Sequence, residues 1–123
     1  MIVTLKWTIA VAGLLALAMS VAVADDVPAA EEVIEEVGID RGQAIVNRQC
    51  VQCHGAGVMG AAAVGAPAWP TLLEHRTYEG LVQSVIRGRG IMPPRAGTEL
   101  SDAELAAAVL YFLKESGVDI DDL

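Results

Sequence analysis

Residues 50–54 read Cys50-Val51-Gln52-Cys53-His54, and they hold both cysteines of the 123-residue chain. Residues three and four positions apart share one face of a helix, so the two sulfur atoms can reach the same edge of a flat ligand while His54 lies beneath it. Cys-x-x-Cys-His is the pattern of c-type haem attachment. The motif therefore predicts one covalently bound haem c, whose iron is bound by His54.

Three other uses of the two cysteines stay open as alternatives. A thioredoxin-like dithiol would need a βαβ pattern, which the sequence lacks. A disulfide between Cys50 and Cys53 would close only a very short loop and add little stability. A zinc site would draw on Cys50, Cys53, His54 and His75, but the adjacent Cys53 and His54 point in different directions.

The sixth iron ligand has three candidates. Met59 follows His54 by five residues, so it lies on the histidine side of the ring and can hardly reach the opposite face. Met92 lies 38 residues after His54, in Gly90-Ile91-Met92-Pro93-Pro94, where two prolines stiffen the backbone. Met92 is the predicted ligand, and the alternative is that it only packs on the porphyrin edge. Ligation by His75 instead would give a bis-histidine haem of lower potential.

The N-terminus has the pattern of an export signal. Lys6 precedes an apolar run over residues 7–21, and Ala22-Val23-Ala24 supplies the small residues that a signal peptidase recognises. We expect residues 1–24 to be a signal peptide and the protein to be periplasmic, which agrees with haem attachment outside the cytoplasm. The apolar run approaches the length of a membrane span, so an uncleaved anchor is the alternative.

The charge balance excludes one class of partner. Eight Lys and Arg residues stand against 16 Asp and Glu residues, a formal charge of −8, which argues against nucleic-acid binding. Residues 25–38 read DDVPAAEEVIEEVG, with six acids and no base. We expect residues 25–39 to be an acidic linker, solvated, frayed or used as a docking arm, and residues 40–123 to form the folded domain.

The rest of the chain has helical patterns and no strand pattern. Asp40 is the expected N-cap of a helix that runs to the cysteines, and glycines and prolines predict a loop over residues 55–70. Thr77 begins a second expected helix, which ends at Gly88. Few aromatic residues are available for the core, so the sequence predicts an all-α fold with a cofactor at its centre.

The last helix has the clearest boundaries. Ser101 and Glu104 form a capping box, and Gly117 stands at the exit. One apolar stripe follows the helix and is expected to be core: Leu105, Val109, Phe112 and Leu113.

Over residues 40–116 the chain resembles a class I c-type cytochrome, nearest to the small bacterial cytochrome c-five-like branch. The shared features are Gly42, Cys50-Val51-Gln52-Cys53-His54, Gly65-Ala66-Pro67, Gly90-Ile91-Met92-Pro93-Pro94-Arg95-Ala96-Gly97 and a terminal helix with Tyr111. The resemblance implies a few helices wrapped round the haem. It also implies that the first and last helices cross closely at Gly42, with Tyr111 packed against the crossing. Val46 departs from the family, which usually has an aromatic residue there.

The resemblance also implies site contacts. Met92 would be the axial ligand, and the carbonyl of Pro67 would accept a hydrogen bond from the second nitrogen of His54. From its chemistry alone, Trp69 could donate to a haem propionate or simply pack in the core. The basic residues around Met92 could pair with propionates, surround an exposed haem edge or stay solvated: Arg87, Arg89 and Arg95.

Ligation by His54 and Met92 would leave no iron site for oxygen or peroxide, so we expect an electron carrier and not an enzyme. The expected carrier is a periplasmic monomer that exchanges single electrons with a terminal oxidase, reductase or dehydrogenase. One alternative is the electron-transfer subunit of a periplasmic oxidoreductase complex, docked through its acidic segment. Another is a haem sensor in which the sixth position is open.

Overall fold

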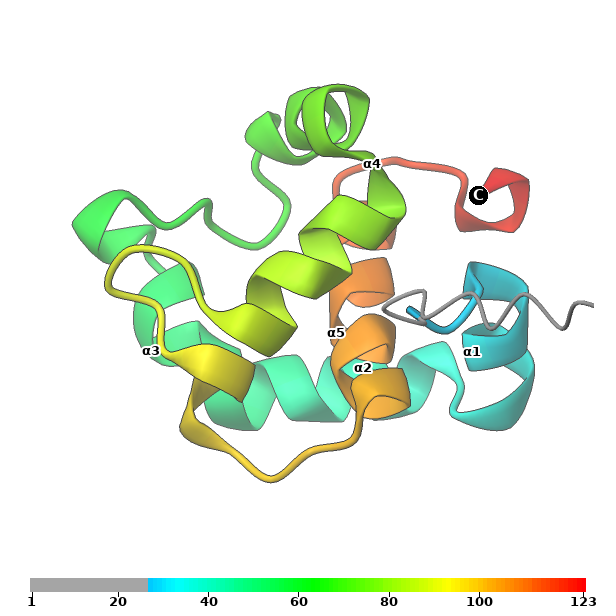
Figure 1. Cartoon of the computed structure of the whole chain (residues 1–123). Helices are drawn as coiled ribbons and strands as arrows, with labels where there is room; N and C mark the ends of the chain where they lie inside the picture. Colours follow the sequence, from blue (N-terminus) through cyan, green and yellow to red (C-terminus); the bar gives the residue numbers. More distant parts are fainter. Residues whose placement is uncertain (1–26) are drawn as a thin grey trace, which may run out of the picture.

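The computed structural model describes residues 27–123 as a bundle of helices around α5 (Figure 1). The elements are α1 (Ala30–Glu36), α2 (Ile39–Ile45), the π-helical turn η1 (Val46–Cys50), α3 (Val51–His54), α4 (Ala68–Arg87), α5 (Asp102–Glu115) and the 3-10 turns η2 (Val58–Gly60), η3 (Pro94–Gly97) and η4 (Ile120–Asp122). Across these residues the β pairing is one isolated bridge, between Arg89 and Met92. The all-α prediction is confirmed.

The expected signal peptide, residues 1–24, lies outside the described residues. From residue 27 onward, the structure contains no helix that is both long enough and hydrophobic enough to cross a bilayer.

Helix α5 forms the centre of the core, as its sequence predicts. The Ser101 side chain accepts from the Glu104 backbone N–H at 3.2 Å, and the Glu104 carboxylate accepts from the Ser101 N–H at 3.0 Å. This capping box satisfies two backbone donors that the helix itself leaves unpaired. Every residue from Leu105 to Leu113 is buried, and α1, α2 and α4 all pack against the helix.

Helices α2 and α5 cross at a contact that only glycine permits. A Cβ atom on Gly42 would overlap the carbonyl oxygen of Ala107 and lie 2.7 Å from its carbonyl carbon. The glycine therefore lets the two backbones touch, as expected for this position. Val46 is fully buried and Tyr111 is 8% exposed, and both belong to the same core cluster.

The prediction of a linker over residues 25–39 is wrong, because residues 30–36 form α1. Ala30 and Val33 share one face of this helix and are 4% and 1% exposed. The Tyr78 hydroxyl donates to the carbonyl of Pro28 at 2.9 Å and fixes the chain before α1. The other face of the helix carries four glutamates. This high acid content made the segment resemble a linker, although it forms an amphipathic helix with a short apolar face.

The entry to α2 also differs from expectation. Gly38, with φ +82°, is the N-cap, and Asp40 lies in the first turn of the helix instead. A carboxylate in that turn still interacts favourably with the helix dipole. The chain then widens into the π-helical turn η1 before α3, a local departure from α geometry that often occurs at functional sites.

Helix α4 begins earlier than predicted. Its helical geometry is interrupted at Thr77, where the sequence predicts a helix to begin. The helix begins at Ala68, and Pro70 lies in its first turn. Proline has no backbone N–H, but an N–H in the first turn has no partner within the helix, so no helical hydrogen bond is lost. Thr77 has φ 64° and ψ 165°, and its hydroxyl accepts from the Gly80 N–H at 3.3 Å. Thr77 thus caps the second half of α4, as the sequence predicts.

Candidate haem site

The motif residues line a cavity of about 1070 Å³ between α3, α4, α5 and the segment 88–97. The volume lies near the upper end of the range for small-molecule sites, roughly 300–1,000 Å³. Its walls are largely apolar and come from every part of the domain except α1 and η4: Ile45, Val58, Leu72, Leu81, Val85, Ile91, Leu100, Leu105, Val109 and Phe112. A large, flat, mostly apolar group fits such walls.

Cys50 and Cys53 both line this cavity as free thiols. Cys50 closes η1 and Cys53 lies in α3, so the helical turn brings both to one side. Cys50 is half-buried, and its burial raises the pKa of the thiol to about 11. Cys53 is exposed. Two unpaired thiols on one cavity wall match the donor set for two thioether bonds.

His54 is held by a backbone hydrogen bond. Its Nδ1 donates to the carbonyl oxygen of Ala62 at 2.7 Å, which leaves Nε2 as the nitrogen that can bind a metal. The Val64 N–H donates to the His54 carbonyl at 2.9 Å and turns the loop back over the histidine. The expectation that Pro67 accepts this bond is therefore wrong, and Pro67 is exposed and not among the residues that line the cavity.

Trp69 lines the cavity, and its indole N–H binds a backbone carbonyl. Its Nε1 donates to the carbonyl of Ala63 at 2.8 Å, so its single donor is already used. The ring stacks on Phe112 with centroids 4.5 Å apart, and the His54 ring lies 5.8 Å from Trp69 and 5.1 Å from Phe112. Of the two alternatives for Trp69, these contacts favour core packing, and the residue still lines the cavity.

Met92 reaches the same cavity from a tight turn. Arg89 and Met92 exchange two backbone hydrogen bonds of 3.0 Å each. Gly88, with φ +80°, allows this turn, since a Cβ there would lie 2.7 Å from the Met92 carbonyl oxygen and 2.8 Å from the Pro94 nitrogen. The backbone around Met92 is therefore fixed by its own bonds.

The other two ligand candidates are placed differently. Met59 also lines the cavity, but it follows His54 closely and is 77% exposed. His75 is exposed and is not among the lining residues. The structure thus brings Met92 and His54 to one cavity and leaves His75 outside it.

The arginines near Met92 do not act as one group. Arg95 donates to the Leu100 carbonyl at 2.6 Å and to Asp102 at 2.7 Å, so it ties the loop to the start of α5. Arg89 is exposed and lines the cavity. Arg76, which the sequence analysis missed, also lines it from α4, and nothing in its spacing would have singled it out.

The walls of one apolar cavity thus carry two neighbouring thiols, an oriented imidazole and a methionine sulfur. Together these groups define the haem site of a c-type cytochrome. Residues 38–112 match the family described as cytochrome C oxidase, cbb3-type, subunit III. The chain belongs to the class I c-type cytochromes, as its resemblance implied.

Named relatives support the same assignment. Cytochrome c5 of Ectopseudomonas mendocina is 39% identical over 69 residues, which are 53% of this chain and 78% of that protein. Cytochrome c5 of Azotobacter vinelandii is 37% identical, covering 58% of this chain and 90% of the relative. Cytochrome c-555 of Chlorobaculum tepidum is 35% identical, covering 61% and 74%.

A solved structure has the same fold. The crystal structure of an electron transfer complex of nitrite reductase with cytochrome c contains a chain with 36% identity and a TM-score of 0.59, covering 62% of this chain and 94% of that one. The protein is thus a c-type cytochrome that carries electrons, and its cofactor is covalently attached haem c with its iron.

Proposed function

We propose that the protein is a periplasmic one-electron carrier whose haem iron is bound by His54 and Met92. One observation carries the proposal: His54 and Met92, from separate segments of the chain, line a single apolar cavity together with both cysteines. Redox proteins are the proposed partners, which agrees with the structural neighbour that is described in complex with nitrite reductase.

Each residue has a distinct role in this proposal. Cys50 and Cys53 form the two thioether bonds, and His54 binds the iron through Nε2 while Ala62 keeps its ring in place. When bound, haem c supplies a reversible one-electron iron couple. The Met92 sulfur and the apolar walls favour the reduced iron and raise its potential. Arg76 and Arg89 are the lining residues with the charge to hold the propionates.

The proposal also includes that the protein is not an enzyme. With His54 and Met92 both bound, the iron offers no position to oxygen or peroxide. Within residues 27–123, no carboxylate lines the cavity to act as a general acid or base. Electron exchange at the haem edge is the chemistry that this ligation would leave.

Export is the remaining part of the proposal. Residues 1–24 would be removed by cleavage after Ala24. Edman sequencing or mass spectrometry of the purified protein identifies its mature N-terminus and tests this. A chain that begins at Asp25 agrees with a periplasmic carrier. A chain that retains Met1 contradicts cleavage and favours the uncleaved anchor.

Potentiometry combined with carbon monoxide tests the ligation. The haem-loaded protein should titrate as a one-electron couple and its ferrous form should not bind carbon monoxide. Met92→Ala should lower the midpoint potential and open the iron to carbon monoxide, because the thioether favours reduced iron and blocks the site. Rapid binding of carbon monoxide by the unchanged protein would contradict the proposal and favour a sensor.

A further inference from the structure

Two neighbouring backbone carbonyls connect His54 with Trp69. The Ala62 carbonyl accepts from His54 Nδ1 at 2.7 Å, and the next carbonyl in the chain, that of Ala63, accepts from Trp69 Nε1 at 2.8 Å. The N–H of Val64, which follows Ala63, donates to the His54 carbonyl at 2.9 Å. This short segment therefore contacts both the imidazole and the backbone of His54, and it also binds the indole of Trp69.

One peptide group in this segment is bound at both of its ends. The carbonyl of Ala63 and the N–H of Val64 belong to the same planar unit, and they point in opposite directions across it. Trp69 binds the carbonyl, and the backbone of His54 binds the N–H. Only the φ and ψ angles of Ala63 lie between this plane and the Ala62 carbonyl that holds the imidazole. Fixing the plane therefore restricts where the Ala62 carbonyl can lie.

The loop that carries the segment has an irregular backbone. Residues 55–65 contain four glycines, and four residues of this stretch have a left-handed φ. Glycine widens the range of conformations open to a chain, so a carbonyl in such a loop is held best by a bond from a rigid element. The Ala63 carbonyl also accepts from the Ala66 N–H at 3.1 Å, which is a bond within the same connection between helices. The indole of Trp69 adds a bond from helix α4.

Trp69 itself is held by the core. It lies in the first turn of α4 and is 7% exposed, and its ring stacks on Phe112 of α5 with centroids 4.5 Å apart. Phe112 is 5% exposed, and α4 and α5 pack against each other. The His54 ring lies next to both aromatic rings, 5.8 Å from Trp69 and 5.1 Å from Phe112. The indole therefore holds Ala63 from a well-packed part of the molecule.

We infer that Trp69 is a positioning residue for the axial histidine: its indole N–H fixes the segment at Ala62 and Ala63, so that the Ala62 carbonyl holds the His54 imidazole in place. A carbonyl that accepts from the second nitrogen of an iron-bound histidine orients the ring and raises its basicity. A more basic imidazole favours ferric iron, so Trp69 lowers the potential through His54. The inference rests on the proposed ligation by His54 and is independent of Met92.

Removing only the indole donor tests this role. Benzothienylalanine has nearly the shape of tryptophan but no N–H, and amber suppression can insert it in place of Trp69. In the ferrous haem-loaded protein, heteronuclear NMR follows the exchange of the His54 Nδ1–H with solvent. We expect exchange to be about fivefold faster than in the unchanged protein, the factor that corresponds to one net intramolecular hydrogen bond. The midpoint potential should rise, because the imidazole becomes a weaker donor.

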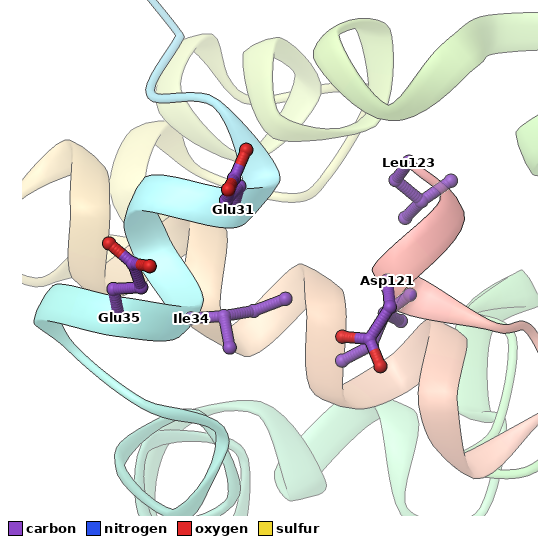
Figure 2. Close-up of a pocket in the computed structure, with 6 residues that line it drawn as sticks. Glu31, Ile34, Glu35, Asp121 and Leu123 are labelled. Carbon is purple, nitrogen blue, oxygen red and sulfur yellow. The ribbon is translucent and has the colours of Figure 1, made fainter.

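Two further variants separate the hydrogen bond from packing. Trp69→Phe keeps an aromatic ring beside Phe112 but loses the donor, so it should change the exchange and the potential in the same directions. Ile34→Ala is the matched control. Figure 2 shows Ile34 of α1 at a pocket of about 350 Å³, which shares no lining residue with the haem cavity. Because Ile34 packs on the core, its loss should lower the free energy of unfolding but leave the exchange at His54 and the potential unchanged.

The outcomes separate the inference from the function beneath it. Unchanged exchange of the His54 Nδ1–H in both Trp69 variants would overturn the inference, while ligation by His54 would stand. A shifted potential with unchanged exchange would also overturn it, because Trp69 would then act on the haem by another route. If the unchanged protein has no slowly exchanging, ring-current-shifted His54 Nδ1–H, His54 does not bind the iron and the proposed function fails. Faster exchange with a higher potential in both Trp69 variants, and neither change in Ile34→Ala, supports the inference.

Discussion

The two halves of the molecule bury apolar side chains in different ways. In the scaffold half, α1 and α2 both pack directly on α5, with Gly42 of α2 against Ala107. The cavity half, residues 55–97, surrounds the haem site with α4 and the turns on either side of it. Within residues 27–123, all four non-glycine residues with positive φ lie there: Met59, Thr77, Arg95 and Ala96. Such strained residues persist where surrounding contacts fix them. Met59 and Ala96 line the cavity, so we expect the haem to supply part of those contacts in this half.

Removing haem attachment should have the largest effect and should affect the two halves differently. In Cys50→Ala with Cys53→Ala, covalent haem is lost and the cavity half loses its bound ligand. We expect amide hydrogen exchange to accelerate much more in residues 55–97 than in α5, because α5 retains its contacts with α2 and α1. Hydrogen exchange followed by mass spectrometry measures this.

Gln52→Ala is the matched control, since Gln52 lines the cavity within the same motif but contributes no thiol. It should keep both the haem and the exchange pattern. An equal loss of protection in the two halves of the double cysteine variant would contradict the division drawn above.

A methyl group at the scaffold crossing should have the next largest effect. Gly42→Ala places a Cβ against the Ala107 carbonyl, and we expect a loss of about 1–3 kcal/mol in the free energy of unfolding. Gly80→Ala is the matched change in α4, where the nearest atom would be Arg76 Cβ at 3.6 Å. Denaturant unfolding should show Gly80→Ala to be neutral or slightly stabilising. An equal loss in the free energy of unfolding for the two variants would mean that the helix crossing is not tightly packed.

The sequence predicts features whose signal lies in side chains. The capping box at Ser101, the cap at Thr77 and the Cys-x-x-Cys-His motif each depend on the chemistry of specific residues, so the residue pattern locates each of them. The close contact at Gly42 was expected from the family resemblance. The apolar stripe of α5 is of the same kind, because its period matches the helix.

What the sequence could not predict depends on the backbone or on context. The partner of His54 is a carbonyl of Ala62, and every residue has a carbonyl, so only the path of the loop selects it. The acceptor of the Trp69 N–H, the carbonyl of Ala63, could not be chosen from the sequence for the same reason. Helix α1 was missed because its acids outnumber its two buried residues, Ala30 and Val33. The placement of Arg76 on the cavity depends on the full turn of α4.

The smallest effect should appear at a hydrogen bond that links the two halves. Tyr78 of α4 donates to Pro28, and burial, with Glu79 nearby, raises the pKa of Tyr78 to about 12. The unfolded chain ionises near pH 10, so the stability from neutral Tyr78 is complete below pH 10 and is lost as the pH rises toward 12.

Denaturant unfolding of the haem-loaded protein at pH 8 to 12 checks this link. The unchanged protein should lose more stability over the alkaline range than Tyr78→Phe, which lacks the ionising group. Parallel curves for the two proteins would show that Tyr78 does not couple the halves in this way.

The optical spectrum of the haem-loaded protein tests the central claim most directly, through the weak far-red band that arises from a bond between ferric iron and methionine sulfur. The account predicts a low-spin c-type spectrum with this band, which Met92→Ala abolishes and Met59→Ala leaves unchanged. A covalently attached but high-spin haem, or a band that survives in Met92→Ala, would contradict it.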